Sequence, residues 1–400
     1  MIALAAVAML VLFAPADEWS QWRGPNRDGV VPAASVPSSW PRDLKRKWTA
    51  QAGSGYASPV VSQGAAFVFA RDGDNETLSR FDLATGKLQW IMPYAAPFQK
   101  NSYANDMSKG PFATPLVRDG RVFTFGVTAV LSAWDAATGK LIWRKDYSKT
   151  VDTSKLFTGT AASPVYEAGS VIVTTGDDRG SAMRAFDPAS GREKWSLPLQ
   201  AGPGYASPVV VDGALVTMTS QSLIAVSAAT GKLQWTLPWK DEWIENIITP
   251  VRAGDLLIFS GVRRGTVAYR MRPNASPVEA WANPGATFYM STPVADGQYL
   301  YGLGSKRKGQ YLCLDLKTGK TLSSTAGREA TQAAVLSAGR YVVWLTNEGD
   351  MVVSRKNPNM FEQVARYSVS SDSGVWTQPV LMGRTVLIKS DTSLALWSLD

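Results

Sequence analysis

The sequence contains no histidine and only one cysteine, Cys313, in 400 residues. Without an imidazole, the chain cannot build a histidine-based catalytic triad, an imidazole zinc site or a C-x-x-C-H haem attachment. A single cysteine cannot form an internal disulfide, a thiolate zinc cage or an iron–sulfur site. Several common enzyme chemistries are therefore excluded before any motif is considered.

Charged residues are also scarce, at 18% of the chain, whereas apolar residues reach 45%. This balance is typical of a folded protein with a large core and argues against disorder. The net charge of +8 favours acidic partners such as an anionic surface or a polysaccharide. For an exported chain, nucleic acid is not an expected partner.

Long hydrophobic runs are absent except at the start of the chain. Residues 1–16 carry no charge and end in Ala14-Pro15-Ala16, a small-x-small cleavage pattern, although a basic n-region is missing. The apolar run at 2–13 is too short to span a bilayer. We predict a signal peptide over residues 1–16 and an exported, periplasmic or extracellular monomer with no transmembrane segment. We expect no lipid anchor, because no cysteine follows the cleavage pattern.

A repeated pattern fills the rest of the chain. A short polar residue, a proline and an apolar run recur at Pro59, Pro115, Pro164, Pro208, Pro250, Pro293 and Pro379. The intervals between these prolines are 56, 49, 44, 42, 43 and 86 residues, and the last is twice 43. A degenerate copy without its proline is therefore expected at residues 333–336. The pattern predicts eight copies.

Each copy reads as four short strands separated by Gly/Asp turns, and no segment has a long helical period. Eight four-stranded units predict an all-β fold, an eight-bladed β-propeller of antiparallel blades over residues 45–400. Only three strands fit after Pro379, whereas residues 45–49 have the form of a fourth strand. We therefore expect the N-terminal strand to complete the last blade and to leave no open sheet edge.

A second motif marks the end of several copies. Residues 133–143 have the form A-x-D-x-x-T-G-x-x-x-W, in which Asp and Thr can bond turn amides, Gly adopts a positive φ and Trp packs between blades. At this spacing and copy number, the sequence resembles the pyrroloquinoline quinone (PQQ)-like eight-bladed propeller superfamily. A copy at residues 315–320 has no tryptophan of its own. The predicted structural docking residues are Trp48, Trp90, Trp143, Trp195 and Trp235.

Residues 17–44 form a leader ahead of the propeller. The stretch at 19–29 resembles the W-x-Q-W-R-G-P-N-R-D-G segment of exported members of this superfamily. We expect Trp19 and Trp22 to fix the leader on the propeller. A binding role for Arg23 and Arg27 is the alternative.

The resemblance leaves two kinds of function open. The superfamily contains quinoprotein dehydrogenases, which hold PQQ and Ca²⁺ on the propeller axis, and non-enzymatic scaffolds similar to the propeller subunit of the outer-membrane β-barrel assembly machine. The alcohol-oxidising members stack the quinone under a vicinal cysteine pair, whereas Cys313 stands alone in an expected strand. Since calcium ligands cannot be placed by motif, we assign no catalytic or metal-binding residue and predict no cofactor. PQQ with Ca²⁺ remains the alternative.

One loop face of the predicted propeller carries charges of both signs. The first blade contributes Asp72, Asp74 and Glu76, and the third contributes Asp177, Asp178 and Arg179. The fifth and sixth blades contribute Arg263, Arg264, Lys306, Arg307 and Lys308. We expect this dipolar face to orient an anionic partner on the basic side. The alternative is that these are solvated hairpin charges.

Aromatic residues are expected to surround the mouth of the axial channel on the same face. Three residues before a strand-one proline stand Tyr56, Phe112, Tyr205 and Trp376. Such a ring can bind peptide, sugar or a flat cofactor, and aromatic packing beneath the loops is the alternative. We predict a non-catalytic exported scaffold that presents this face to a protein or an envelope polymer. The alternatives are a PQQ- and calcium-dependent oxidoreductase and a polysaccharide-binding module.

Overall fold

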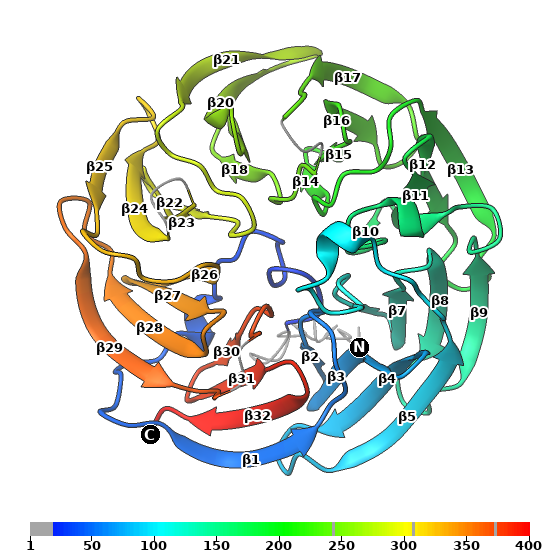
Figure 1. Ribbon diagram of the computed structural model, residues 1–400, viewed down its shortest axis with the longest axis horizontal. Coiled ribbons are helices and arrows are strands. Elements are labelled where there is room, and N and C mark those ends of the chain that lie inside the picture. Colours follow the sequence, from blue (N-terminus) through cyan, green and yellow to red (C-terminus); the bar gives the residue numbers. More distant parts are fainter. Residues whose placement is uncertain (1–18, 242–244, 306–308, 372–373) are drawn as a thin grey trace, which may run out of the picture.

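The computed structural model describes residues 19–241, 245–305, 309–371 and 374–400. The predicted signal peptide and the residues Lys306, Arg307 and Lys308 lie outside the described residues. In the described part, 32 strands form eight four-stranded antiparallel sheets around a central axis (Figure 1). This confirms the predicted eight-bladed propeller.

Each blade runs from a short inner strand to an outer strand at the rim. Blades one to four are β2 (Val60–Ser62), β3 (Ala65–Asp72), β4 (Asn75–Asp82), β5 (Leu88–Ala95); β6 (Leu116–Arg118), β7 (Arg121–Phe125), β8 (Val130–Asp135), β9 (Leu141–Asp146); β10 (Val165–Glu167), β11 (Ser170–Asp177), β12 (Gly180–Phe186), β13 (Glu193–Leu199); and β14 (Val209–Val211), β15 (Ala214–Met218), β16 (Ser222–Ser227), β17 (Leu233–Pro238).

The second half of the chain repeats this order. Blades five to eight are β18 (Val251–Ala253), β19 (Leu256–Gly261), β20 (Gly265–Arg272), β21 (Ala275–Asn283); β22 (Val294–Asp296), β23 (Tyr299–Gly304), β24 (Gln310–Asp315), β25 (Thr321–Ser324); β26 (Ala333–Ala338), β27 (Tyr341–Thr346), β28 (Asp350–Arg355), β29 (Glu362–Ser368); and β30 (Val380–Met382), β31 (Thr385–Lys389), β32 (Ser393–Ser398), β1 (Lys45–Gln51). The described residues also contain three single-turn 3₁₀ helices: η1 (Ala33–Ser35) lies in the leader, and η2 (Ser102–Ala104) and η3 (Thr153–Lys155) lie in connections between blades.

The repeated proline sets the length of the inner strand. In seven blades the inner strand has three residues and begins directly after the proline, which has no N–H to donate to a ladder. In the seventh blade no proline is present, and β26 extends over six residues that pair from Ala333 to Ala338. The degenerate copy expected at residues 333–336 is therefore a complete inner strand.

The N-terminal strand closes the ring. β1 pairs antiparallel with β32, with Thr49 opposite Ala395, and gives the eighth sheet the order β1-β32-β31-β30. Figure 1 shows blue β1 along the outer edge of red β32. The expected closure is confirmed, and the edge of the last blade is covered.

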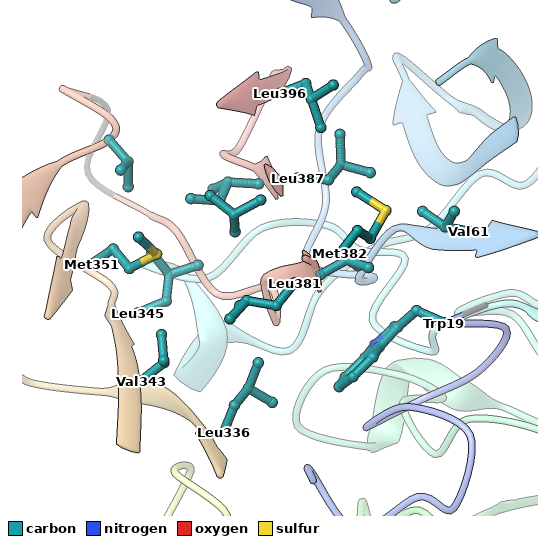
Figure 2. Close-up of a cluster of buried hydrophobic side chains, with 14 of the residues drawn as sticks. Trp19, Val61, Leu336, Val343, Leu345, Met351, Leu381, Met382, Leu387 and Leu396 are labelled. Atoms are coloured by element: carbon teal, nitrogen blue, oxygen red, sulfur yellow. The ribbon is translucent and has the colours of Figure 1, made fainter. Parts of the chain in front are cut away.

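Apolar side chains fill the spaces between neighbouring blades. A large cluster joins blades seven, eight and one and includes Leu336, Val343, Leu381 and Val61 (Figure 2). Trp19 of the leader belongs to the same cluster and is 2% exposed. The leader is therefore part of the core at the point where the chain closes.

Candidate functional site

The polar residue in front of the repeated proline joins neighbouring blades at five junctions around the axis. At these junctions a serine or threonine hydroxyl accepts a hydrogen bond from the backbone N–H at the same position of the preceding blade. Such bonds run from Gln378 to Ser58, Ser58 to Thr114, Thr114 to Ser163, Ser163 to Ser207, and Thr249 to Thr292, at 2.9–3.2 Å. The sequence showed these residues as a repeat, but their partners lie one blade away and were not foreseen.

An aromatic group lies at the mouth of the axial channel. The ring of Tyr56 stacks on Trp376, with centroids 5.3 Å apart and planes 22° apart, and meets the edge of Phe112 at 5.6 Å. The three residues and Tyr205 line one cavity of about 130 Å³, which Ile247 and Met290 complete. The structure thus brings together four aromatic residues whose first and last members, Tyr56 and Trp376, stand 320 positions apart in the sequence.

The cavity wall is neutral. The hydroxyl of Tyr56 accepts a hydrogen bond from Ser108 N–H at 3.2 Å, and the hydroxyl of Tyr205 accepts one from Phe157 N–H at 2.7 Å. Burial raises the pKa of both phenols, so both stay protonated at physiological pH. The remaining lining residues are Trp, Met, Phe, Ile, Ala, Ser and Thr, and none carries a charge.

The leader forms one wall of this cavity. The indole N–H of Trp22 donates to the hydroxyl of Thr249 at 2.8 Å, and Trp22 lines the cavity. Trp19 is fixed by two backbone hydrogen bonds to Val61 of β2, at 2.9 and 3.0 Å. In Figure 1 the dark-blue leader crosses the middle of the ring.

Two buried arginines anchor the leader to inner-strand carbonyls. Arg27 donates to Pro208 O at 2.7 Å and to Pro164 O at 2.9 Å, and Arg23 donates to Pro293 O at 2.8 Å. Burial lowers the pKa of Arg23 to about 10 and that of Arg27 to about 9, so both remain charged at neutral pH. With 1% and 2% of their surface exposed, neither can reach a ligand in solution.

The residues at the axis do not fit a calcium-bound quinone. PQQ carries three carboxylates, which need cationic partners, and Ca²⁺ takes six to eight oxygen ligands including carboxylates. The cavity wall offers neither, and no group of three or more Asp, Glu, Cys or His residues in the described ranges could hold a metal ion. Cys313 is buried, and burial raises the pKa of its thiol to about 11, which disfavours the reactive thiolate.

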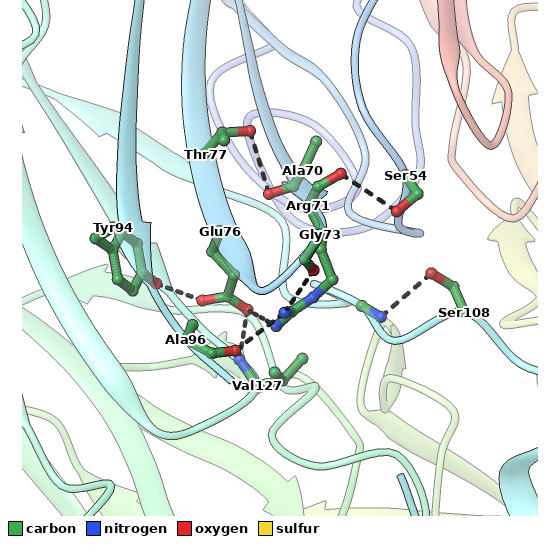
Figure 3. Close-up of polar contacts among 11 residues, drawn as sticks. Ser54, Ala70, Arg71, Gly73, Glu76, Thr77, Tyr94, Ala96, Ser108 and Val127 are labelled. Atoms are coloured by element: carbon green, nitrogen blue, oxygen red, sulfur yellow. Dashed lines mark hydrogen bonds and ion pairs between the residues drawn. The ribbon is translucent and has the colours of Figure 1, made fainter. Parts of the chain in front are cut away.

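Glu76 differs from the expectation of a solvated acid. It is fully buried, accepts hydrogen bonds from the Tyr94 hydroxyl and from Val127 N–H at 2.9 Å, and lies 3.6 Å from the Arg71 guanidinium (Figure 3). Val127 belongs to blade two, so this carboxylate fastens blade one to its neighbour. The carboxylate is buried because its hydrogen-bond donors, the Tyr94 hydroxyl and Val127 N–H, lie inside the protein. The sequence around residue 76 does not show these donors.

Asp177 is a second acid that is withdrawn from the loop face. It is 4% exposed, pairs with Arg179 and accepts from Asp152 N–H at 3.1 Å. The hydrogen bond from Arg179 is the main cause that lowers the pKa of Asp177 to about 2. The expected acidic side of the face therefore retains Asp72, Asp74 and Asp178 as its exposed carboxylates.

The described basic residues of the fifth blade lie beside a crossing loop. The Arg264 guanidinium lies 4.7 Å from the ring centroid of buried Trp239, and Arg263 donates its backbone N–H to Asp241 at 2.9 Å. Both arginine side chains are exposed. They lie outside the wall of the aromatic cavity, so the structure does not join the basic and aromatic residues into one pocket.

The docking tryptophans pack from one blade onto the turn of the next. The indoles of Trp48, Trp90, Trp143 and Trp195 each lie against a turn glycine and donate to a carbonyl of that turn at 3.0–3.1 Å. Trp281 of blade five does the same on Gly319, with its N–H 2.7 Å from Leu316 O, and was not anticipated. Trp235 packs with Leu237 and Met271 on a neighbouring core cluster instead.

Comparison with known proteins gives one family and two kinds of relatives. Residues 74–325 match the family model described as outer membrane protein assembly factor BamB. The BamB of Moranella endobia is 26% identical over 254 residues, covering 60% of this chain and 63% of the relative. The 1-butanol dehydrogenase (cytochrome c) of Thauera butanivorans is 28% identical over 218 residues, covering 51% of this chain and 30% of the relative.

A likeness among solved structures extends over nearly the whole chain. The quinohemoprotein alcohol dehydrogenase from Comamonas testosteroni superposes with a TM-score of 0.70 at 14% identity, over 96% of this chain and 80% of that one. At this identity the likeness shows the fold alone. The chain spans less than two thirds of the length of the curated relatives named above.

None of the helices in the described residues is long and apolar enough to cross a membrane.

Proposed function

This chain belongs to the PQQ-like propeller family of the outer membrane protein assembly factor BamB, and we propose that it is a non-catalytic scaffold. Its loop face binds a partner protein or an envelope polymer, and the aromatic cavity accepts one apolar side chain of that partner. Export through the segment at residues 1–16 is part of the proposal, and the names of the BamB relatives support a place in the cell envelope.

The size and neutrality of the axial cavity carry this proposal. Small-molecule and cofactor sites enclose roughly 300–1,000 Å³ and usually hold a few charged or metal-binding groups. The cavity encloses about 130 Å³ and is lined by neutral residues, which suits a single aromatic or aliphatic side chain. Buried apolar anchors of this kind supply much of the affinity of protein interfaces.

A calorimetric titration distinguishes the scaffold from a quinoprotein. The chain from Asp17 onward is titrated with PQQ in the presence and absence of Ca²⁺. We expect no heat beyond dilution, because the cavity wall carries no cation for the quinone and the described residues hold no carboxylate cluster for Ca²⁺. Saturable one-to-one binding that requires Ca²⁺ would overturn the proposal.

Site-specific photo-cross-linking in the native host tests the binding role directly. A benzoylphenylalanine replaces Phe112 at the cavity mouth or, as a control, exposed Leu141 on outer strand β9. We expect a discrete adduct from position 112 alone, and a Met290→Trp change, which fills the cavity, should abolish it while Met290→Leu should not. A smear sensitive to glycosidases would assign the face to a polymer. The absence of any adduct at position 112 would contradict the proposal.

A further inference from the structure

Six outer-strand tryptophans lie at junctions between blades in the described residues, and one of them, Trp235, has no receiving turn. At five junctions an indole N–H donates to a turn carbonyl of the next blade at 2.7–3.1 Å, and a glycine of the same turn lies against the indole face. A Cβ at Gly191, for example, would lie 2.7 Å from Cδ2 of Trp143, so only glycine fits. These five junctions show what an indole in this position binds.

The junction of blades four and five lacks that turn. β20 and β21 are joined by Pro273 and Asn274, a two-residue turn without glycine and without the D-x-x-T-G pattern. Trp235 of β17 faces this junction, and its indole N–H has no hydrogen-bond acceptor among the described residues. The atom is also not buried, so the donor is open to a ligand.

A groove of about 1,050 Å³ lies at this junction and includes Trp235, Met271 and Pro277 in its wall. Of the charged residues at the groove, Arg252 pairs with Asp212 at 3.2 Å, and Asp255 pairs with Arg270 of β20.

Two exposed groove cations, Lys232 and Arg272, pair with no carboxylate in the part of the chain that the structure describes. The groove therefore has two cations without a carboxylate partner and an indole N–H, that of Trp235, without an acceptor.

We propose that this groove binds a glycine-containing turn of an acidic partner protein. A backbone carbonyl of the turn accepts the Trp235 N–H, its glycine lies on the indole face, and its carboxylates pair with Lys232 and Arg272. The five internal junctions supply the geometry of the turn, and the uncompensated cations supply the preference for an acidic one. This surface lies at the rim of the propeller and is separate from the axial cavity.

The test uses a peptide as the probe. A head-to-tail cyclic peptide copies residues 134–141, with Trp134→Ala and Lys140→Glu so that it has two carboxylates and no indole. It is titrated into the chain labelled with 5-fluorotryptophan, and the ¹⁹F resonances of Trp235 and Trp195 are assigned by Trp→Phe changes. We expect a saturable shift at Trp235 with a dissociation constant of about 1 mM, and none at the docked Trp195.

Variants separate the named interactions. Trp235→Phe keeps an aromatic ring but has no N–H, so binding, followed by calorimetry, should weaken about fivefold. The double change Lys232→Glu and Arg272→Glu should weaken binding about five- to tenfold. The same peptide with Gly139→Val should not bind, because its Cβ would meet the indole.

Three outcomes would overturn the inference: no shift at Trp235, an equal shift at Trp195, or binding unaffected by the charge reversals. Self-association that Trp235→Phe abolishes would assign the groove to a second copy of the chain and would also overturn it. None of these outcomes changes the cross-linking at position 112, because that position lies at the axis and Trp235 lies on the outer strand.

Discussion

At the scale of the residue, Glu76 shows how a hairpin acid can hold two blades together. Replacing Glu76 with alanine leaves the Arg71 guanidinium buried without its carboxylate and removes the acceptor of Val127 N–H. We expect the free energy of unfolding to fall by about 3–5 kcal/mol, as for other buried pairs that lose one partner. Urea denaturation measures the loss, and Asp74→Ala, at an exposed position of the same hairpin, should change it by less than about 0.5 kcal/mol.

Lys389 of β31 gives a pH dependence that can be measured. Its ammonium is buried and donates to the carbonyls of Gly55, Ser390 and Asp391, while burial lowers its pKa from 10.5 to about 7. Between these two pKa values the unfolded chain binds more protons than the folded one, so this residue makes stability rise with pH from about 7 to 10.5.

Lys389→Met is the matched control for that linkage, because it keeps the buried chain and removes the titrating group. The free energy of unfolding of the wild type minus that of Lys389→Met should increase over this window and stay level below it. A difference that is constant from pH 7 upward would mean that the three carbonyls keep the lysine protonated.

At the scale of the element, the outer strands allow a paired comparison. Trp195→Phe and Trp235→Phe remove the same indole N–H, but only that of Trp195 has a carbonyl partner, Ala228 O at 3.0 Å. We expect Trp195→Phe to lower the free energy of unfolding by about 1 kcal/mol more than Trp235→Phe, the net worth of one hydrogen bond. Equal losses in chemical denaturation would show that Trp235 has an equivalent acceptor after all.

The same elements show what could be predicted from the sequence. Strand number and ring closure follow from a repeat of proline, turn and tryptophan, because each signal acts within one blade. The docking of Trp281 was missed since its own blade has no D-x-x-T-G turn, whereas the turn that receives it belongs to the next blade. The four cavity aromatics were found because one repeat position places them at equal depth around the axis. The burial of Glu76 depends on Val127 in another blade, which no local pattern contains.

At the scale of the whole molecule, two N-terminal segments, the leader and β1, each stabilise the closed ring of blades. The leader ties the inner strands of blades three, four and six through Arg23 and Arg27, and β1 closes the outer strand of blade eight. The two devices act at different radii, one at the axis and one at the rim. They also have different consequences for the site, because the leader's Trp22 forms part of the cavity wall and β1 does not touch it.

Two truncations separate these devices. A chain that begins at Asp43 loses all but the last two residues of the leader and keeps β1, so it should remain monomeric and folded. Its melting temperature should be lower, and its cavity no longer has Trp22 in the wall. A chain that begins at Ala52 also loses the pairing of β1 with β32 and the packing of Trp48 on Gly86. The bare edge of β32 should then pair between molecules, since an unpaired strand edge is a template for association. Light scattering after size-exclusion chromatography measures both variants, and a monomeric Ala52 variant with the stability of the Asp43 variant would show that closure by β1 is dispensable.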